Sequence, residues 1–534
     1  MADPVSIISL VDLCLKYGTI LIQKCSAFRH AHAELNERRI RVENYWLRTK
    51  IQLQVLQKAA DSGSLGDEFC AIQYETLELL LTKLKVAYQN VHSVMKKNDP
   101  ETDQLRVQRL KYALIQQKID KSIQDLELWQ QIFDPSWYMI LKAATPQIDA
   151  TLQLYQESSS KKANSPVSAA QSLRIALDPV RSSKTPIWLS ENGLNHVHLE
   201  DISLSSARQG RRENPAKSLI IETIQPIPGA NYKRFERDVR DLARKLAHSD
   251  PLEFGLLNCK GVIRHDSGTK AEGAPAFTLV FRLPLGFKEV CSLRSSLRDI
   301  SKTDSLSDRF KLARDLTKSV GSIHTFGFVH KDIRPETILI MTKEASSSSA
   351  AFLVGFDSFR TAEGMTLRKG DLPWERCLYQ HPSRMGSTPT EDFIMQHDIY
   401  SLGVCLLEIG LWENFVYYDE RDSLLPNDGS PTSTTQSEFL GGDLDITLFK
   451  ERLLSLARTE LKIRMGSRYS DVVVTCLTCL DPDNSDFGDE REFQDADGLL
   501  VGVRYIEKVR HFPFLLGVWC MSPTDNFSAH HANQ

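Results

Sequence analysis

The sequence predicts a multidomain protein, in which an N-terminal all-α helical bundle is followed by an α+β domain. Apolar residues recur three or four positions apart through the first 157 residues, as they do on the buried face of a helix. No glycine occurs between Gly66 and Gly193, which favours helices over a sheet with tight turns. After residue 185, short β-like runs come first and helical patterns follow, an order typical of an α+β domain.

Length, charge and cysteine content narrow the class of protein. The 534 residues suffice for two to four domains at about 150 residues each. The formal net charge is −4, so no overall basic field attracts nucleic acid, and we expect no nucleic-acid partner. The ten cysteines are sparse and irregularly spaced, which predicts free thiols in a reducing compartment and hence a cytoplasmic protein.

The first predicted helix begins at Asp3 and Pro4, an N-cap residue followed by a proline in the first turn. It is apolar around most of its circumference through residue 25, yet Asp12 and Lys16 interrupt it. The pattern is neither a secretory signal, which needs a basic start, nor an ordinary membrane span. Asp12 and Lys16 are four residues apart, a spacing at which the two charges can pair on a helix.

Further helices are predicted over about 35–60, 67–95 and 103–133, with shorter pieces at 136–144 and 146–156. A segment rich in Ser, Lys, Ala and Pro follows and is typical of a linker. The predicted domains are the helical bundle over 1–157, the linker over 158–184, the α+β domain over 185–515 and a tail over 516–534.

Three runs in the α+β domain have β character, at 218–224, 256–263 and 277–283. The Ser- and Ala-rich run at 345–351 predicts a surface loop. Cys476 and Cys479 have a spacing found in zinc sites, but no second pair follows, so we expect them on a buried helix face.

Three motifs in the α+β domain resemble the protein-kinase family. They are GFVHKDIRPETILI at 327–340, FLVGFDSFR at 352–360 and HDIYSLGVCLLEIGLW at 397–412, in the family's order and spacing, with YQHPS at 379–383 in the place of the Ala-Pro-Glu motif. The resemblance implies a bilobal kinase-like fold over roughly 186–515. It also implies that Asp332 occupies the position of the catalytic base, that His330 is a packed spine residue, and that Asp398 braces the loop. A structural loop carboxylate, satisfied by nearby amides, is the alternative for Asp332.

Phosphoryl transfer needs two metal-holding groups, and the sequence departs from the family at both. Thr337 stands where the family has a metal-binding asparagine, and a threonine hydroxyl is a shorter, poorer ligand. Gly355 stands where the family has the aspartate of Asp-Phe-Gly, since this sequence reads Gly355-Phe356-Asp357. Asp357 lies two residues further on and needs another backbone path to reach a metal.

The parts that hold nucleotide phosphates in kinases also depart from the family. The strand at 218–224 has Ile224 near the position of the phosphate-binding lysine, and no lysine lies between Lys217 and Lys233. Asp238, or alternatively Glu236, occupies the place of the helix glutamate that would pair with that lysine. The glycine-rich loop is absent, because only Gly193 and Gly210 occur between residues 165 and 228.

The N-terminal part resembles the helical HeLo domain of fungal prion-inhibition and propagation proteins. The residues that carry this resemblance are Ala2 to Ser6, the apolar first helix, Arg38-Arg39-Ile40-Arg41-Val42 and Trp46-Leu47. In that family the bundle kills cells by pushing its first helix into membranes. Ile8, Val11 and Leu15 are then the candidate membrane or oligomerisation residues, whereas a plain core helix of a bundle is the alternative.

Together these features predict a non-catalytic signalling protein, a pseudokinase whose kinase-like domain binds a protein partner and controls the bundle. The bundle would form homo-oligomers or contact a membrane on activation, as in a cell-death or incompatibility effector. No cofactor is expected. A divergent Ser/Thr kinase that uses Asp332 with ATP and magnesium, and a scaffold without membrane action, are the alternatives.

Overall fold

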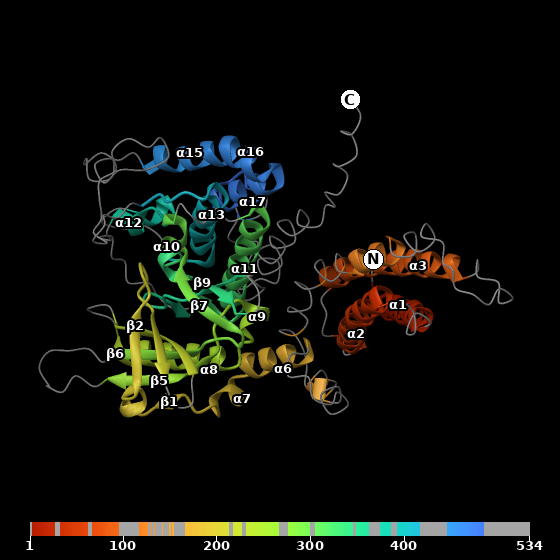
Figure 1. Ribbon diagram of the computed structural model, residues 1–534, viewed down its shortest axis with the longest axis horizontal. Helices are drawn as coiled ribbons and strands as arrows, with labels where there is room; N and C mark the ends of the chain where they lie inside the picture. Colours follow the sequence, from red (N-terminus) through yellow and green to blue (C-terminus); the bar gives the residue numbers. More distant parts are fainter. Residues whose placement is uncertain are drawn as a thin grey trace, which may run out of the picture. The chain divides into compact units, whose positions relative to one another are not determined.

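The chain has a helical N-terminal part followed by a mixed α/β region, as the sequence predicts (Figure 1). Its contacts divide it into two compact units, Met1–Arg174 and Ile175–Gln534. The computed structural model describes residues 3–26, 33–61, 63, 67–95, 117–126, 129, 133, 141, 149–150, 152–153, 166–212, 217–226, 231–265, 276–299, 305–344, 349–361, 374–385, 392–416, 446–484 and 487.

Three long helices dominate the first unit: α1 (Pro4–Cys25), α2 (Ala33–Asp61) and α3 (Asp67–Met95). The predicted start of α1 is confirmed, because the Asp3 carboxylate accepts a hydrogen bond from the Ser6 N–H at 2.8 Å and Pro4 opens the first turn. The bounds of α2 and α3 agree with the predicted helices to within a few residues. Most of the predicted helix over 103–133 lies outside the described residues, which include its 117–126 stretch.

One face of α1 is buried against α2 and α3. Its buried residues are three or four positions apart, as an amphipathic helix requires: Ile7, Leu10, Val11, Cys14, Gly18, Leu21 and Cys25. Gly18 lies under the ring of Trp46 in α2, so closely that a Cβ there would fall 1.9 Å from a ring carbon. Gly18 therefore allows a close contact between α1 and α2 at this point.

The predicted linker is partly helical. It contains α6 (Pro166–Leu177) and α7 (Pro179–Ser183), while residues 158–165 lie outside the described part of the chain. Arg174 in α6 donates to the Asp149 carboxylate at 2.9 Å and to the Leu141 carbonyl at 2.9 Å. These contacts attach α6 to the first unit, although the two units divide just after Arg174.

The second unit contains a six-stranded sheet in the order β1–β5–β6–β4–β3–β2 (Figure 1). All its pairs are antiparallel except β1 with β5. The strands are β1 (Trp188–Leu189), β2 (Val197–Asp201), β3 (Arg208–Arg212), β4 (Lys217–Ile224), β5 (Cys259–His265) and β6 (Ala276–Arg282). Helix α8 (Tyr232–Ala247) packs against β5 and covers this sheet with its apolar face.

Two smaller sheets follow along the chain. One has the order β10–β9–β7 and the other pairs β11 with β8. Their strands are β7 (Phe287–Ser292), β8 (Phe328–Val329), β9 (Ile338–Lys343), β10 (Ser349–Leu353) and β11 (Arg360–Thr361). The expectation of a loop over 345–351 was wrong at its end, because Ala350 and Ala351 belong to β10 and are buried. Both residues pair with β9, Ala350 with Met341 and Ala351 with Ile340, and this pairing determines their conformation despite the low-complexity sequence.

The other elements described in the second unit are helices, and α13 is buried along its whole length. They are α9 (Pro251–Phe254), α10 (Leu293–Arg298), α11 (Leu306–Thr325), α12 (Trp374–Cys377), α13 (Met395–Leu411), α15 (Ile446–Leu456), α16 (Lys462–Met465) and α17 (Ser467–Leu477), with short turns η2 (Glu191–Leu194), η3 (Pro335–Thr337), η4 (Pro382–Arg384) and η5 (Ala457–Leu461). Helix α13 packs against α11 and α17. Cys476 and Cys479 are buried free thiols, but only Cys476 lies on α17, whereas Cys479 lies in the turn that follows, so the expectation of a shared helix face was wrong for Cys479.

Among the described helices, only α1 is long and apolar enough to cross a membrane, judged by length and composition alone. A core helix of a bundle meets the same criterion, and α1 does bury one of its faces. The opposite face leaves Val5 67% exposed and Leu13 41% exposed.

We predict that Gly18→Ala loosens α1, because the added methyl group overlaps the Trp46 ring and overpacking costs about 1–3 kcal/mol. Hydrogen exchange of the α1 amides in the full chain should show a matching loss of protection. Thr19→Ala, at an exposed position on the same helix, is the control and should retain protection. Full protection in Gly18→Ala would mean that α1 and α2 are not in close contact at this point.

Candidate functional site

The loop from His330 to Thr337 connects β8 to β9 and ends with the turn η3. A buried carboxylate binds the start of this loop. Asp398, in the first turn of α13, accepts hydrogen bonds from the N–H groups of His330 at 2.7 Å and Lys331 at 2.9 Å, and from the His324 ring at 3.0 Å. Lys331 has a φ of 70°, a conformation costly for a lysine, so these bonds fix a strained turn. Burial raises the pKa of Asp398, but the hydrogen bonds and electrostatic interactions that His324 and His330 supply together outweigh it, and the pKa lies below its usual value.

His330 is a packed residue of the loop. Its ring is fully buried and lies 5.1 Å from the ring of Phe356, centroid to centroid. Nε2 donates to the Val354 carbonyl at 2.9 Å, and Nδ1 accepts from the Asp332 N–H at 3.3 Å. Burial lowers the pKa of His330, which favours the neutral ring that these two bonds require.

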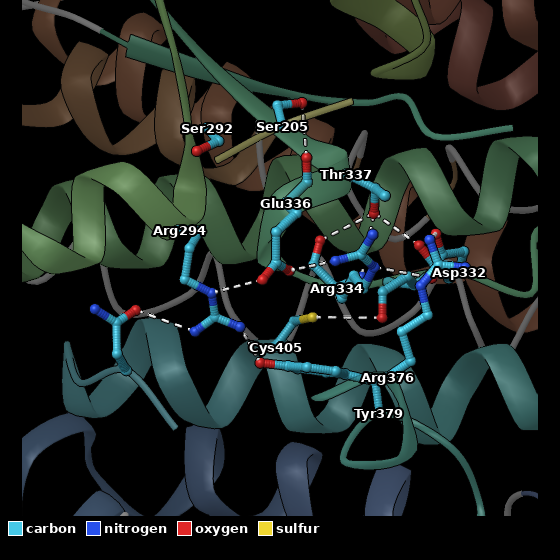
Figure 2. A network of polar contacts seen from close by, with 12 residues as sticks. Ser205, Ser292, Arg294, Asp332, Arg334, Glu336, Thr337, Arg376, Tyr379 and Cys405 are labelled. Atoms are coloured by element: carbon cyan, nitrogen blue, oxygen red, sulfur yellow. Dashed lines mark hydrogen bonds and ion pairs between the residues drawn. The ribbon is translucent and has the colours of Figure 1, made fainter. Parts of the chain in front are cut away.

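Asp332, at the position that resembles a catalytic base, is held by two guanidinium groups (Figure 2). Arg334 donates from Nε to Oδ1 at 2.9 Å, and an Arg376 nitrogen lies 3.9 Å from Oδ2. Asp332 is only 7% exposed, and its Oδ2 makes no hydrogen bond to any described residue. Its partners are therefore arginine side chains, rather than the backbone amides that the alternative interpretation expected.

Thr337 turns its hydroxyl group into the loop. The single hydroxyl proton is shared between the carbonyl oxygens of Asp332, at 2.7 Å, and Arg334, at 2.9 Å, and the oxygen accepts from the Arg334 N–H at 3.2 Å. Thr337 is 1% exposed. Its hydrogen-bonding capacity is thus used within the backbone of its own loop.

Gly355 is packed directly against Thr337. A Cβ at residue 355 would lie 2.2 Å from the Thr337 Cγ2 and 2.6 Å from its Cβ. The φ of Gly355 is +89°, a region that residues with side chains rarely adopt. Position 355 therefore has no room for a carboxylate while Thr337 keeps its present place.

Sequence reasoning missed Glu222, which lies on β4 and is fully buried. Its carboxylate accepts hydrogen bonds from the N–H of Gly355 at 3.1 Å and from that of Phe356. Burial and the negative charges of Asp357 and Asp332 raise its pKa to about 8. The available signal was one acid in the otherwise apolar run SLIIETI, but attention fell on the missing lysine and on Ile224.

Asp357 lies in the turn after Phe356 and is half-buried. Burial and the charge of Asp332 raise its pKa, while Arg376 and Arg334 oppose the shift. Glu222, Asp332 and Asp357 therefore influence one another electrostatically. No group of three or more His, Cys, Asp or Glu in the described residues has the arrangement of a metal site.

The two acids predicted on α8 do not reach Glu222 by any hydrogen bond or ion pair within the described residues. Asp238 is 6% exposed, with an Arg237 nitrogen 3.8 Å away, and burial raises its pKa. Glu236 accepts from Arg264 at 3.0 Å. Ile224 is a buried core residue at the end of β4, where it pairs with Phe277.

A buried ionic network continues from the loop into the helical part (Figure 2). The Arg294 side chain has no exposed surface and donates to Glu336 at 3.0 Å, Glu408 at 2.8 Å and the Tyr379 hydroxyl. An Arg334 nitrogen lies 3.2 Å from the second oxygen of Glu336. Burial opposes ionisation of Glu336, but Arg294 and Arg334 outweigh it and lower its pKa to about 2.

The membrane candidates on α1 differ in exposure. Val11 is fully buried in the first unit, whereas Ile8 and Leu15 are half-buried. Asp12 accepts a hydrogen bond from Gln57 in α2 at 2.9 Å, and it is not paired with Lys16. On α1, the apolar side chains that are exposed to a partner or a membrane at rest are therefore Val5 and Leu13, with parts of Ile8 and Leu15.

The residues do not fit the magnesium and ATP that a kinase would bind. The Thr337 hydroxyl is engaged by backbone groups, and Gly355 supplies no ligand atom. Glu222, which lies beside Gly355, accepts hydrogen bonds from backbone N–H groups and supplies no positive charge for phosphates. The arrangement suits a rigid loop, held by hydrogen bonds and ion pairs among its own residues, better than a phosphoryl-transfer centre.

Comparison with known proteins supplies no family for this chain. No protein-family model matches it, and no curated protein matches it either.

We predict that the contribution of Glu222 to the stability of the second unit falls as the pH rises from 5 to 8. The pKa of Glu222 is about 8 in the folded state, against 4.5 for an exposed glutamate, so over this range the folded state holds a proton at this side chain that the unfolded state has released. Glu222→Gln cannot titrate and should remove up to one proton from this dependence. Urea unfolding midpoints at pH 5, 6, 7 and 8 measure it.

Glu236→Gln on the surface of α8 is the matched control and should keep the wild-type slope. If Glu222→Gln also keeps that slope, Glu222 is already ionised throughout the range and the predicted proton uptake is wrong.

Proposed function

We propose that this chain is a non-catalytic signalling protein. A kinase-like domain over residues 185–515 binds a protein partner and controls an N-terminal helical bundle, which forms homo-oligomers or contacts a membrane on activation. The protein acts in the cytoplasm and reaches the membrane only in the activated state. Its output is a cell-death or incompatibility signal.

The arginine clamp on Asp332 carries this proposal. A general base needs a carboxylate oxygen free to accept a proton from the reacting hydroxyl. Arg334 bonds Oδ1 and Arg376 lies beside Oδ2, so two guanidinium groups occupy the space from which a substrate hydroxyl would approach the carboxylate. The closed contact between Gly355 and Thr337 supports the same conclusion, because it occupies the space of a metal ligand.

The arrangement of elements supports a kinase-like interpretation of the second unit. A mostly antiparallel sheet carries one long helix, α8, and is followed by α11, α13 and the helices up to α17. The loop that resembles the catalytic loop lies between β8 and β9, and Asp398 binds it from α13. A kinase-like scaffold that lacks the metal-binding and phosphate-binding residues can still bind a protein partner through its surface.

The first helix supports the membrane or oligomer part of the proposal. Helix α1 has 22 residues, or about 33 Å at about 1.5 Å per residue, against a bilayer core of about 30 Å. Asp12, Lys16 and Lys24 oppose insertion, since a charge at mid-bilayer costs roughly 2.5–3.5 kcal/mol on insertion scales. Insertion is therefore conditional, and oligomers that shield these charges promote it.

One observation favours the alternative of a divergent Ser/Thr kinase. The Oδ2 atom of Asp332 is buried and makes no hydrogen bond to any described residue, so it can still accept one. In this alternative, substrate binding would displace Arg376, and Asp357 would act in metal binding.

We predict that the purified chain does not transfer phosphate from ATP in the presence of magnesium, because Thr337 and Gly355 supply no free ligand. Autophosphorylation with radiolabelled ATP measures this. Asp332→Asn is the diagnostic variant. Magnesium-dependent transfer that Asp332→Asn abolishes would overturn the proposal and establish the kinase alternative.

We predict that Leu13→Lys abolishes liposome leakage by the activated protein and leaves the resting bundle folded. Leu13 is already 41% exposed, so a lysine there costs little at rest but about 3 kcal/mol inside a bilayer. Leakage of a trapped dye, with circular dichroism to verify folding, measures both effects. Val11→Lys would unfold the bundle and is not informative.

Leu47→Lys is the control, because Leu47 is 54% exposed on α2 and would stay outside the membrane. Equal leakage by the wild type and both lysine variants would exclude insertion of α1. Absence of leakage under any activating condition, with partner binding intact, would support the scaffold alternative.

A further inference from the structure

We propose that the second unit binds a phosphate group in a basic cavity separate from the Asp332 loop. The cavity has a volume of about 160 Å³. It lies among α9, α11, β7, β9 and β10, and four cationic side chains line it: Lys311, Arg314, Lys318 and Lys343. The proposal is independent of whether the chain is catalytic.

The fold brings these four side chains together from two elements. Lys311, Arg314 and Lys318 are three and four residues apart on α11, so they lie on one face of that helix. Lys343 comes from the end of β9, and its ammonium group lies 5.6 Å from the centroid of the Phe287 ring. That ring supports the lysine at the rim of the cavity.

The lining carries a strong excess of positive charge. Asp315 is the only acid among the described residues that line the cavity, beside the four cations. An Arg314 nitrogen lies 3.8 Å from the Asp315 Oδ1, while Lys318 donates to the Leu252 carbonyl. Arginine has five donors and an ammonium group three, so each of these two side chains retains donors for a ligand.

The positive charges of Arg314 and Lys343 repel the ammonium group of Lys311. Burial lowers its pKa; Asp315 opposes the shift, whereas the charges of Arg314 and Lys343 add to it. A bound anion would relieve this repulsion. Asp315 then helps to keep Lys311 charged while leaving the net charge positive.

Size and donor geometry select the ligand. Pockets for drug-sized ligands measure about 300–1,000 Å³, so this cavity is too small for a nucleoside but accommodates one phosphate with water. A guanidinium fork binds phosphate oxygens in pairs, and lysines supply the remaining charge. The ligand is therefore inorganic phosphate or the phosphate of a small phosphomonoester.

Calorimetric titration of the full chain tests the proposal, with inorganic phosphate in one series and glycerol 3-phosphate in the other, at constant ionic strength set with chloride. We expect saturable binding that weakens at least tenfold in Arg314→Gln and in Lys343→Gln. Preference for one of the two titrants identifies free or esterified phosphate as the natural ligand.

Lys288→Gln is the matched control, because Lys288 is exposed on β7, pairs with Glu344 at 3.4 Å and does not line the cavity. It should bind as the wild type does. Lys343 is exposed, so its variant remains informative if Arg314→Gln fails to fold. No saturable heat with either titrant, or equal affinity in all variants, would overturn the proposal.

Discussion

Arg294 places a guanidinium group with no exposed surface between the carboxylates of Glu336 and Glu408. A charge buried in this way persists only when it is fully paired, and removal of one partner of such a pair costs about 3–5 kcal/mol. Arg294 comes from α10, while its partners come from η3, from α13 and from the Tyr379 segment. Four segments far apart in the sequence therefore hold their positions through one side chain.

The loop around Asp332 is connected to Arg294 through a chain of ion pairs. Glu336 bonds Arg294 on one side and lies beside Arg334 on the other, and Arg334 in turn holds Asp332. Asp398 fixes the opposite end of the loop from α13. The acid that resembles a catalytic base is thus the last member of an ionic chain that begins in the core.

Much of the architecture could be predicted from the sequence, because its signals are local. Asp3 before Pro4 marks the start of α1, and the 3.6-residue period gives the bounds of α3. The candidate site could be predicted only in part. Motifs identify His330, Asp332 and Asp398, but the partners of Asp332 depend on contacts across the fold, such as that of Arg376.

Glu222 shows the limit most clearly. Its carboxylate contacts backbone amides more than 130 residues away in the sequence. The residues of β4 alone do not indicate which of them will reach those amides. Ile224 lies two residues further along β4, and the sequence contains no signal that favours Glu222 over it as the residue that reaches the loop. The cavity lined by Lys311 and Lys343 was missed for the same reason, since its walls come from separate elements.

The contact between Gly355 and Thr337 also restricts the mutational routes open to this protein. A single change of Gly355 to aspartate would introduce a Cβ 2.2 Å from the Thr337 side chain, so it would cost stability before it could supply a ligand. A single change of Thr337 would break the hydrogen bonds that its hydroxyl group makes within the loop and still leave position 355 without a side chain. Each residue makes replacement of the other unfavourable, so neither substitution alone provides an accessible intermediate toward a metal-binding site.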